Sequence, residues 1–280
     1  MACDIRPLGN VMAAEAIGLD LNRPLDAETR QRLHAALVER QVLCLRRQDL
    51  APSAYVRAAE AFGEPQLQLR RASRHPDNAY IMVLASTDRD ALGDGRRVVV
   101  GEYWHTDDSY FAVPAKVTML LAKALPSSGG DTRFCNMALA LERLPAATRQ
   151  RLAGLRARHR YQSRRAGGRI MTRSAAEAAE TPEVSHPLIR THPESGRPAL
   201  YLNPNRMESV VGLSDADSDR LLDELGEHAT RPEFQYQHRW QSGDLLLWDN
   251  RSTMHRASAD YPDGDLRLMH RVLLKGTVPV

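Results

Sequence analysis

The sequence predicts a mainly β fold with flanking helices, a double-stranded β-helix of the jelly-roll, cupin-like type. Three observations support this: the apolar or alternating segments are short, Gly and Pro separate them, and long helical patterns are few. With 280 residues, 42% of them hydrophobic, the chain can bury the core of one large domain spanning residues 1–280. No internal repeat is evident.

The first hundred residues contain two helical patterns around one strand. Apolar residues recur at helical spacing over 26–39, Val42–Leu45 is an apolar run typical of a buried strand, and 51–62 predicts a second helix. The stretch 65–101 is interrupted by Pro and Gly and reads as loop. Because long irregular segments are more often functional than mere spacers, we expect a lid near 65–101.

The remaining two thirds predict a sheet-rich core with a few helices. An apolar run over 116–125 indicates a core strand, and two short helical patterns follow it. The last third alternates strand patterns with one further helix. The predicted helices cover 138–144, 146–155 and 215–228, and the predicted strands cover 234–239, 245–248 and 269–274.

The segment 151–173 is unusually basic, with eight arginines and no acidic residue. One interpretation is a solvated surface; the other is a lid near 156–185, whose positive charge would suit an anionic substrate. The net charge of the chain is only +3, and just three of its 38 basic residues are lysines, which indicates a compositional bias toward arginine. A nucleic-acid partner is therefore not expected.

The cysteines and apolar segments bear on location. Cys3, Cys44 and Cys135 have no CxxC spacing, so neither a disulfide framework nor a structural zinc site is indicated. No stretch approaches the roughly 20 apolar residues of a membrane span, and the N-terminal residues do not form a signal peptide. We expect a cytoplasmic protein that does not associate with membranes.

Three His-x-Asp/Glu triplets are candidates for a metal site. Two imidazoles and one carboxylate can occupy one face of an octahedral ferrous ion and leave three positions open. Such triplets arise by chance roughly once or twice in a chain of this composition. His75-Pro76-Asp77 and His192-Pro193-Glu194 carry proline and read as turns, which favours the third triplet, His105-Thr106-Asp107.

The spacing of the remaining polar residues favours this third triplet as well. On a regular strand, His105 and Asp107 would project to the same face because side chains alternate along a strand. His255 follows a strand and a turn-like segment, which predicts a loop position at the mouth of the sheet. Arg267 and Arg271 lie 12 and 16 residues beyond it, so both guanidiniums would share a face and could each bind an anion.

Over nearly its full length the chain resembles the TauD/TfdA family of Fe(II)- and 2-oxoglutarate-dependent dioxygenases. The motifs that carry the resemblance are Gly18-Leu19-Asp20-Leu21, Ala61-Phe62-Gly63-Glu64, Trp104-His105-Thr106-Asp107, Pro126–Thr132, Trp248-Asp249-Asn250-Arg251 and Met269-His270-Arg271. The resemblance implies the cofactors Fe(II), 2-oxoglutarate and O2, with His105, Asp107 and His255 as metal ligands and catalytic residues. It also implies that Arg267 and Thr132 bind 2-oxoglutarate and that Arg271 binds the acidic group of the substrate.

The resemblance further implies a reaction. Oxidative decarboxylation of 2-oxoglutarate to succinate would accompany hydroxylation of a small anionic organic substrate, with C–O or C–S cleavage where the hydroxylated product is unstable. Halogenating relatives replace the ligand carboxylate by a small residue, so Asp107 favours hydroxylation. A redox-inert, metal-binding cupin-like module is the alternative from a different class. Homodimers or homotetramers are common among similar enzymes.

The substrate is predicted less directly. Sulfonate-cleaving relatives place a histidine after the Phe-Gly-Glu motif, whereas this chain continues Pro65-Gln66-Leu67-Gln68. An aryloxyalkanoate or another small carboxylate is therefore favoured over a sulfonate or alkyl sulfate, which remains the alternative. Gln68, Tyr103 and Tyr110 are the further candidates for the substrate pocket, although a tyrosine beside a strand is often packing material.

Overall fold

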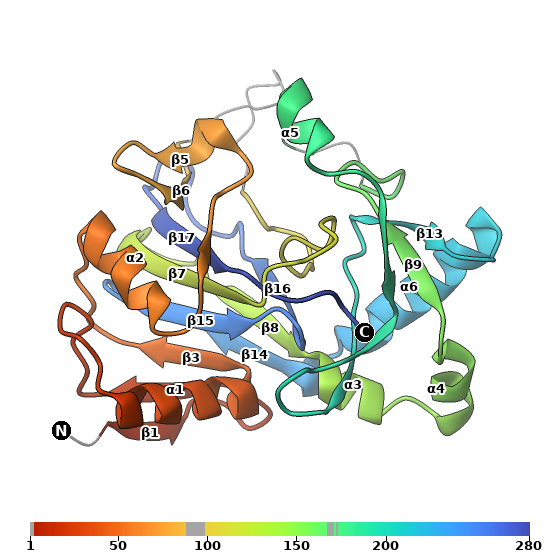
Figure 1. Ribbon diagram of the computed structural model, residues 1–280, viewed down its shortest axis with the longest axis horizontal. Helices are drawn as coiled ribbons and strands as arrows, with labels where there is room; N and C mark the ends of the chain where they lie inside the picture. Colours follow the sequence, from red (N-terminus) through yellow and green to blue (C-terminus); the bar gives the residue numbers. More distant parts are fainter. Residues whose placement is uncertain (1–2, 88–98, 167–170, 172) are drawn as a thin grey trace.

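The computed structural model describes residues 3–87, 99–166, 171 and 173–280. Two facing β-sheets flanked by helices form the centre of the molecule (Figure 1), so the mainly β, jelly-roll prediction is confirmed. The major sheet has the strand order β1 (Asp4–Pro7), β2 (Ala14–Ile17), β3 (Val42–Leu45), β15 (Leu245–Asp249), β7 (Val117–Ala124), β17 (Leu268–Leu274), β6 (Asn78–Ala85) and β5 (Arg74–His75), and β4 (Pro65–Gln66) also pairs with β17.

The minor sheet faces the major one and carries part of the polar site. Its strand order is β14 (Gln235–His238), β8 (Thr132–Asn136) and β16 (Thr253–Ala257), all antiparallel. Two smaller sheets lie beyond it, on the right in Figure 1. They are β10 (Val184–Pro187), β9 (Arg156–His159) and β13 (Met207–Val210), and the pair β11 (Ile189–Thr191) and β12 (Pro198–Leu200).

Because successive side chains of the central strands point to opposite faces, the major sheet contributes to a hydrophobic core on each of its two faces. Leu245 and Leu247 of β15 pack on the side of the helices α1 and α2, whereas Leu246 and Trp248 face the minor sheet and pack with Phe134 of β8. A strand with both faces covered needs apolar residues at every position, which is why β15 and β7 read as continuous apolar runs.

The helices cover the outer faces of the two sheets (Figure 1). On the major sheet, Asp26 caps the first helix by accepting a hydrogen bond from the Thr29 backbone N–H (2.7 Å), and left-handed Gln41 ends it. On the other side, α3 and α6 pack against the outer face of the minor sheet. The helices are α1 (Ala27–Arg40), α2 (Pro52–Glu60), α3 (Met137–Glu142), α4 (Ala146–Leu152), α5 (Ala175–Ala179) and α6 (Asp215–Ala229), with 3₁₀ turns at Arg71–Ser73 and Pro232–Phe234.

Three expectations about local structure were wrong. The stretch 65–101 contains the eight-residue strand β6, which pairs with β17 although Pro and Gly elsewhere in the stretch favoured loop. His255 lies within strand β16 and not in a loop. Asp107 lies in a turn and not on a strand, so alternation is not what brings it beside His105. Within the described part of the chain, no helix combines the length and apolar character needed to cross a membrane.

Candidate active site

Three predicted side chains converge between the two sheets. His105 Nε2 lies 3.8 Å from Asp107 Oδ1, and His255 Nε2 lies 3.7 Å from Asp107 Oδ2. The centroids of the two imidazole rings are 4.1 Å apart. One potential ligand atom from each residue lies within 4.8 Å of those of the other two, which is close enough for a single metal ion to contact all three.

Main-chain hydrogen bonds hold the two histidines side by side although 150 positions separate them in the sequence. The His105 N–H donates to the His255 carbonyl (3.0 Å) and the His255 N–H donates to the His105 carbonyl (2.8 Å), which makes an isolated antiparallel bridge. Asp107 reaches the same point through the turn that follows. The convergence therefore results from strand pairing between distant segments and from a turn.

Burial and hydrogen bonding prepare these groups for a cation. Burial lowers the pKa of both His105 and His255 and so favours neutral imidazoles. His105 Nδ1 donates to the Tyr103 carbonyl (2.6 Å), which leaves the Nε2 lone pair directed toward Asp107. Burial alone would raise the pKa of Asp107, but the Arg271 guanidinium and a hydrogen bond from the Thr118 hydroxyl outweigh it and lower that pKa to about 2. Two neutral imidazoles and a carboxylate suit a ferrous ion.

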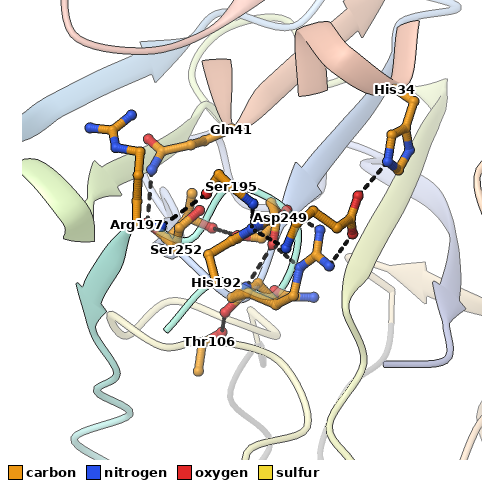
Figure 2. A network of polar contacts seen from close by, with 12 residues as sticks. His34, Gln41, Thr106, His192, Ser195, Arg197, Asp249 and Ser252 are labelled. Atoms are coloured by element: carbon orange, nitrogen blue, oxygen red, sulfur yellow. Dashed lines mark hydrogen bonds and ion pairs between the residues drawn. The ribbon is translucent and has the colours of Figure 1, made fainter. Parts of the chain in front are cut away.

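The residues of the competing triplet at His192 belong to a network of hydrogen bonds and ion pairs. His192 Nε2 lies 2.9 Å from Asp249 Oδ2, and Arg251 binds the same carboxylate through Nη2 at 2.6 Å. Arg251 also pairs with Glu194, which in turn contacts His34 of α1. Figure 2 shows this network, in which the Asp249 carboxylate accepts from His192 and Arg251. It anchors the turn after β15 and offers no open face to a metal.

A second cluster of donors, Cys44, His238 and Asp244, is also buried. The Arg46 guanidinium lies 2.7 Å from Asp244 Oδ2, and His238 Nε2 lies 3.1 Å from the same oxygen. Burial raises the pKa of the Cys44 thiol, which disfavours the thiolate that a metal requires. The cluster is therefore a buried ion-pair network and not a metal centre.

An inner cavity extends from the three converging side chains toward Thr132 and Arg267. Arg267 is 7% exposed, its Nε donates to the Gly130 carbonyl (3.2 Å), and among the described residues its Nη2 has no hydrogen-bond partner. A Cβ on Gly130, whose φ is +72°, would lie 3.3 Å from Arg267 Cδ, so glycine suits both the turn and the close approach. A buried guanidinium with a spare donor suits an anionic ligand.

The walls of the inner cavity are otherwise apolar. They include Leu84, Leu120 and Trp248, whose side chains exclude water from the space beside the metal-binding triplet. Thr132 Oγ1 accepts a hydrogen bond from Trp240 Nε1 (3.0 Å), so its own proton is free to be donated into the cavity. The cavity thus joins a prospective metal site at one end to a hydroxyl and a guanidinium at the other, an arrangement that fits 2-oxoglutarate.

A larger outer cavity opens on the opposite side of the triplet and contains Tyr103, Tyr110 and Arg271, as predicted. Gln68 does not line it. The Gln68 side chain is 1% exposed, and its Oε1 accepts a hydrogen bond from Arg271 Nη2 (3.1 Å). Gln68 therefore orients Arg271, and the prediction that it lies in the substrate pocket is replaced by this indirect role.

Several residues of the outer cavity were not predicted, among them Tyr161 and Arg206. The Arg206 guanidinium lies 4.5 Å from the Tyr161 ring centroid and 5.6 Å from that of Tyr110, within the range of cation–π contacts. They come from the segments that follow β9 and β12. No local pattern in the sequence distinguishes them from surface residues.

A buried histidine close to the turn that holds Asp107 predicts an acid-sensitive fold. Burial lowers the pKa of His186 to about 4, and its Nε2 donates to the Phe111 carbonyl (2.9 Å). The unfolded chain takes up this proton near pH 6.5, so stability is complete above that pH and is lost as pH falls toward 4. Between pH 7 and 5 the loss from His186 is about 2 kcal/mol. His186→Gln is expected to show a correspondingly smaller decrease in urea-unfolding free energy, and an unchanged pH slope would contradict the assignment.

Comparisons with known proteins agree with this geometry. The profile of the "Taurine catabolism dioxygenase TauD, TfdA family" matches residues 4–273. The chain belongs to this family. It is 35% identical over 266 residues to an alpha-ketoglutarate-dependent 2,4-dichlorophenoxyacetate dioxygenase of Cupriavidus pinatubonensis, covering 91% of this chain and 92% of that protein. It is 33% identical over 285 residues to an alpha-ketoglutarate-dependent sulfate ester dioxygenase of Pseudomonas putida, covering 99% and 91%.

A solved structure extends the likeness to three dimensions. The crystal structure of AAD-2 in complex with Mn(II) and N-oxalylglycine superposes with a TM-score of 0.85 at 29% identity, covering 100% of this chain and 99% of that one. As a member of the TauD/TfdA family the chain is a 2-oxoglutarate-dependent non-haem iron dioxygenase, an oxidoreductase that uses Fe(II), 2-oxoglutarate and O2. The predicted family, enzyme class and cofactors are confirmed.

Proposed function

We propose that His105, Asp107 and His255 hold the ferrous ion and that Thr132 and Arg267 bind the distal carboxylate of 2-oxoglutarate. The convergence of the three donors at one end of the inner cavity, with a buried guanidinium at the other, supports these roles. When bound, iron and 2-oxoglutarate supply the oxidising chemistry, in which O2 is consumed, succinate and carbon dioxide are released and a substrate carbon is hydroxylated. The chain's own contribution is orientation and exclusion of water.

Each group has a distinct task in this arrangement. Arg267 offers a planar fork that matches a carboxylate and fixes the direction of the cosubstrate in its cavity. Leu84, Leu120 and Trp248 keep water out of the cavity, which strengthens the interactions of the charged groups inside it. Arg271 lies 3.2 Å from Asp107 Oδ1 and lines both cavities, so an anion bound to it lies directly beside the metal site.

The substrate that suits the outer cavity is a small carboxylate with an apolar or aromatic body, of the aryloxyalkanoate class. Arg271 is the observation that carries this proposal, because it places a guanidinium in the wall of the outer cavity beside Asp107. Leu69, Met82 and Met171 supply apolar wall, and Tyr110 and Tyr161 supply aromatic wall. The dioxygenase of Cupriavidus pinatubonensis, named for a phenoxyacetate, supports the same class.

An alkyl sulfate or sulfonate is the second candidate, because the guanidinium of Arg271 also matches a sulfate oxygen pair and a sulfate ester dioxygenase is among the relatives. To separate the two classes, phenoxy acids, alkyl sulfates, sulfonates and amino acids are compared at equal concentration for stimulation of succinate release. Greatest stimulation by phenoxy acids supports the first class. Stimulation by alkyl sulfates alone would transfer the assignment to the second.

Arg271→Leu is expected to raise the KM for the stimulating anion by about 100-fold, because a buried charge partner is worth several kcal/mol. Slow succinate release without that substrate should persist, which separates loss of substrate binding from loss of the metal site. Tyr103→Phe provides a matched control, since Tyr103 lines the same cavity but is 47% exposed and carries no charge. An unchanged KM in Arg271→Leu would show that the anion binds elsewhere.

We further propose that the chain acts as one domain in which segments 65–101 and 156–185 form lids, and residues 88–98, 167–170 and 172 of these segments lie outside the described residues. Described residues from both segments, among them Leu69 and Tyr161, supply wall to the outer cavity. A homodimer or homotetramer in the cytoplasm is the proposed form in the cell, and the three free, buried cysteines suit a reducing compartment. Light scattering of the purified protein tests the subunit number, and fractionation of the host cell tests the location.

A further inference from the structure

Two buried side chains join Asp107 to the turn after β15. Thr118 of β7 donates from Oγ1 to Asp107 Oδ2 at 2.6 Å, and Asn250 donates from Nδ2 to Thr118 Oγ1 at 2.8 Å. Thr118 is 0% exposed and Asn250 is 1% exposed. Neither residue lines the inner or the outer cavity, so neither is placed to contact substrate or cosubstrate.

The direction of these hydrogen bonds is fixed by chemistry. An indole N–H can only donate, and Trp248 Nε1 lies 3.1 Å from Asn250 Oδ1, so the amide oxygen must face the indole and the amide nitrogen must face Thr118. With an N–H directed at its oxygen, the Thr118 hydroxyl has its single proton available for Asp107. An ionised carboxylate accepts that proton and cannot return one.

The end of β15 and the turn after it also contact His255, another member of the triplet. The Trp248 ring packs against the His255 ring with centroids 4.6 Å apart. Thr106 Oγ1 donates to the Asn250 carbonyl (2.8 Å), which holds the backbone just before Asp107. On its far side the turn is anchored by the network of Asp249 and Arg251 in Figure 2. The end of β15 and the turn after it therefore contact two of the three donor residues, His255 through Trp248 and Asp107 through Asn250.

We propose that Trp248, Asn250 and Thr118 form a directed relay that sets the orientation of the Asp107 carboxylate, with Thr118 and Asn250 as positioning residues for the metal site. This inference rests on the proposed role of Asp107 as a ligand. Holding Oδ2 with a buried hydroxyl restricts rotation of the carboxylate, so that its lone pairs stay directed at the space between the two imidazoles. Outer partners of this kind contribute about 10- to 100-fold to metal affinity.

The test measures Mn(II) binding to the full-length apoprotein under anaerobic conditions, from the decrease of the free Mn(II) signal in electron paramagnetic resonance. Thr118→Val keeps the side-chain shape but removes the hydroxyl, and Thr118→Ser keeps the hydroxyl. We expect Thr118→Val to weaken Mn(II) binding by about 10- to 100-fold and Thr118→Ser to stay close to the wild type. Thermal unfolding of each apoprotein confirms that the variants fold.

Asn250→Leu provides a second, independent comparison. It leaves the Thr118 hydroxyl in place but without a fixed direction, so a smaller loss of Mn(II) affinity is expected than in Thr118→Val. Asn250 reaches Asp107 through Thr118 and also accepts a longer hydrogen bond from the Asp107 N–H at its Oδ1 (3.4 Å). Because one of the two routes is shared with Thr118, the combined loss in the double variant should be smaller than the product of the two single losses. Multiplicative losses would overturn the relay and indicate two unrelated structural roles.

The outcomes also separate this inference from the proposed function. Wild-type Mn(II) affinity in folded Thr118→Val, or equal weakening in Thr118→Ser, would overturn the relay while Asp107 keeps its role. Undiminished Mn(II) binding in Asp107→Ala would instead refute the proposed metal site itself. One pattern supports both the relay and the proposed metal site: Mn(II) binding that is strong in Thr118→Ser, weaker in Thr118→Val and weakest in Asp107→Ala.

Discussion

Asp107→Ala is expected to weaken Fe(II) binding by more than about 100-fold, because the loss of a ligand should exceed the 10- to 100-fold typical of an outer partner. Succinate release should fall to the background rate. The substitution removes the only carboxylate of the converging triplet and leaves two neutral imidazoles, which cannot neutralise a divalent ion. The measurement is anaerobic titration with Fe(II) and 2-oxoglutarate, followed by the weak visible charge-transfer absorption of their complex.

The chain offers a matched control for this experiment. Asp77→Ala removes the carboxylate of a competing triplet, His75-Pro76-Asp77, whose acid is exposed to solvent. It should titrate as the wild type does. Charge-transfer absorption that survives in Asp107→Ala, or that disappears in Asp77→Ala, would show that the metal lies elsewhere.

Arg267→Met is expected to raise the Kd for 2-oxoglutarate by about 100-fold, since a buried guanidinium that pairs with a carboxylate is worth several kcal/mol. The same substitution should leave the stability of the apoprotein unchanged or increase it. Arg267 is buried without an ion pair among the described residues, and burial lowers its pKa, so the free protein bears a desolvation cost that methionine does not.

Thermal unfolding measures both effects in one experiment. At 100 times its Kd, 2-oxoglutarate with Mn(II) stabilises the wild type by about 2.7 kcal/mol, and Arg267→Met should lose most of this gain at the same concentration. Arg267→Lys keeps the charge but not the planar fork and should give an intermediate Kd. Equal stabilisation of wild type and Arg267→Met by 2-oxoglutarate would place the cosubstrate elsewhere.

The fold was predictable wherever burial imposes a local pattern. The apolar runs of β3, β7 and β15 and the periodicity of α1 and α6 are direct consequences of packing in the sheets and on their faces. The strand β6 contains an apolar run, Ile81–Ala85, like those of β3 and β7, but the Pro and Gly residues elsewhere in 65–101 favoured loop over the whole stretch. A local breaker signal thus outweighed a local strand signal.

The residues of the site were also predictable only in part. Four of them were found, because few types of side chain can bind a metal ion or an anion. They are His105, Asp107, His255 and Arg267. The reason given for the first pair was wrong, since a turn and not strand alternation places Asp107. Thr118 and Arg206 were not found, because a threonine in a core strand and an arginine in a loop have many ordinary uses, and only their neighbours in space distinguish them.

Because the main chains of His105 and His255 are hydrogen-bonded to each other, the geometry of the active site depends on the folding of the whole chain. The two residues belong to distant segments, and their reciprocal hydrogen bonds form only when those segments are in register. A cation bound by both imidazoles would link the two segments, so its binding energy would add to the free energy of local unfolding at this pairing. Loss of iron should therefore favour local unfolding where His105 and His255 pair. The apoprotein should be cleaved by proteases there more readily than the iron-bound protein.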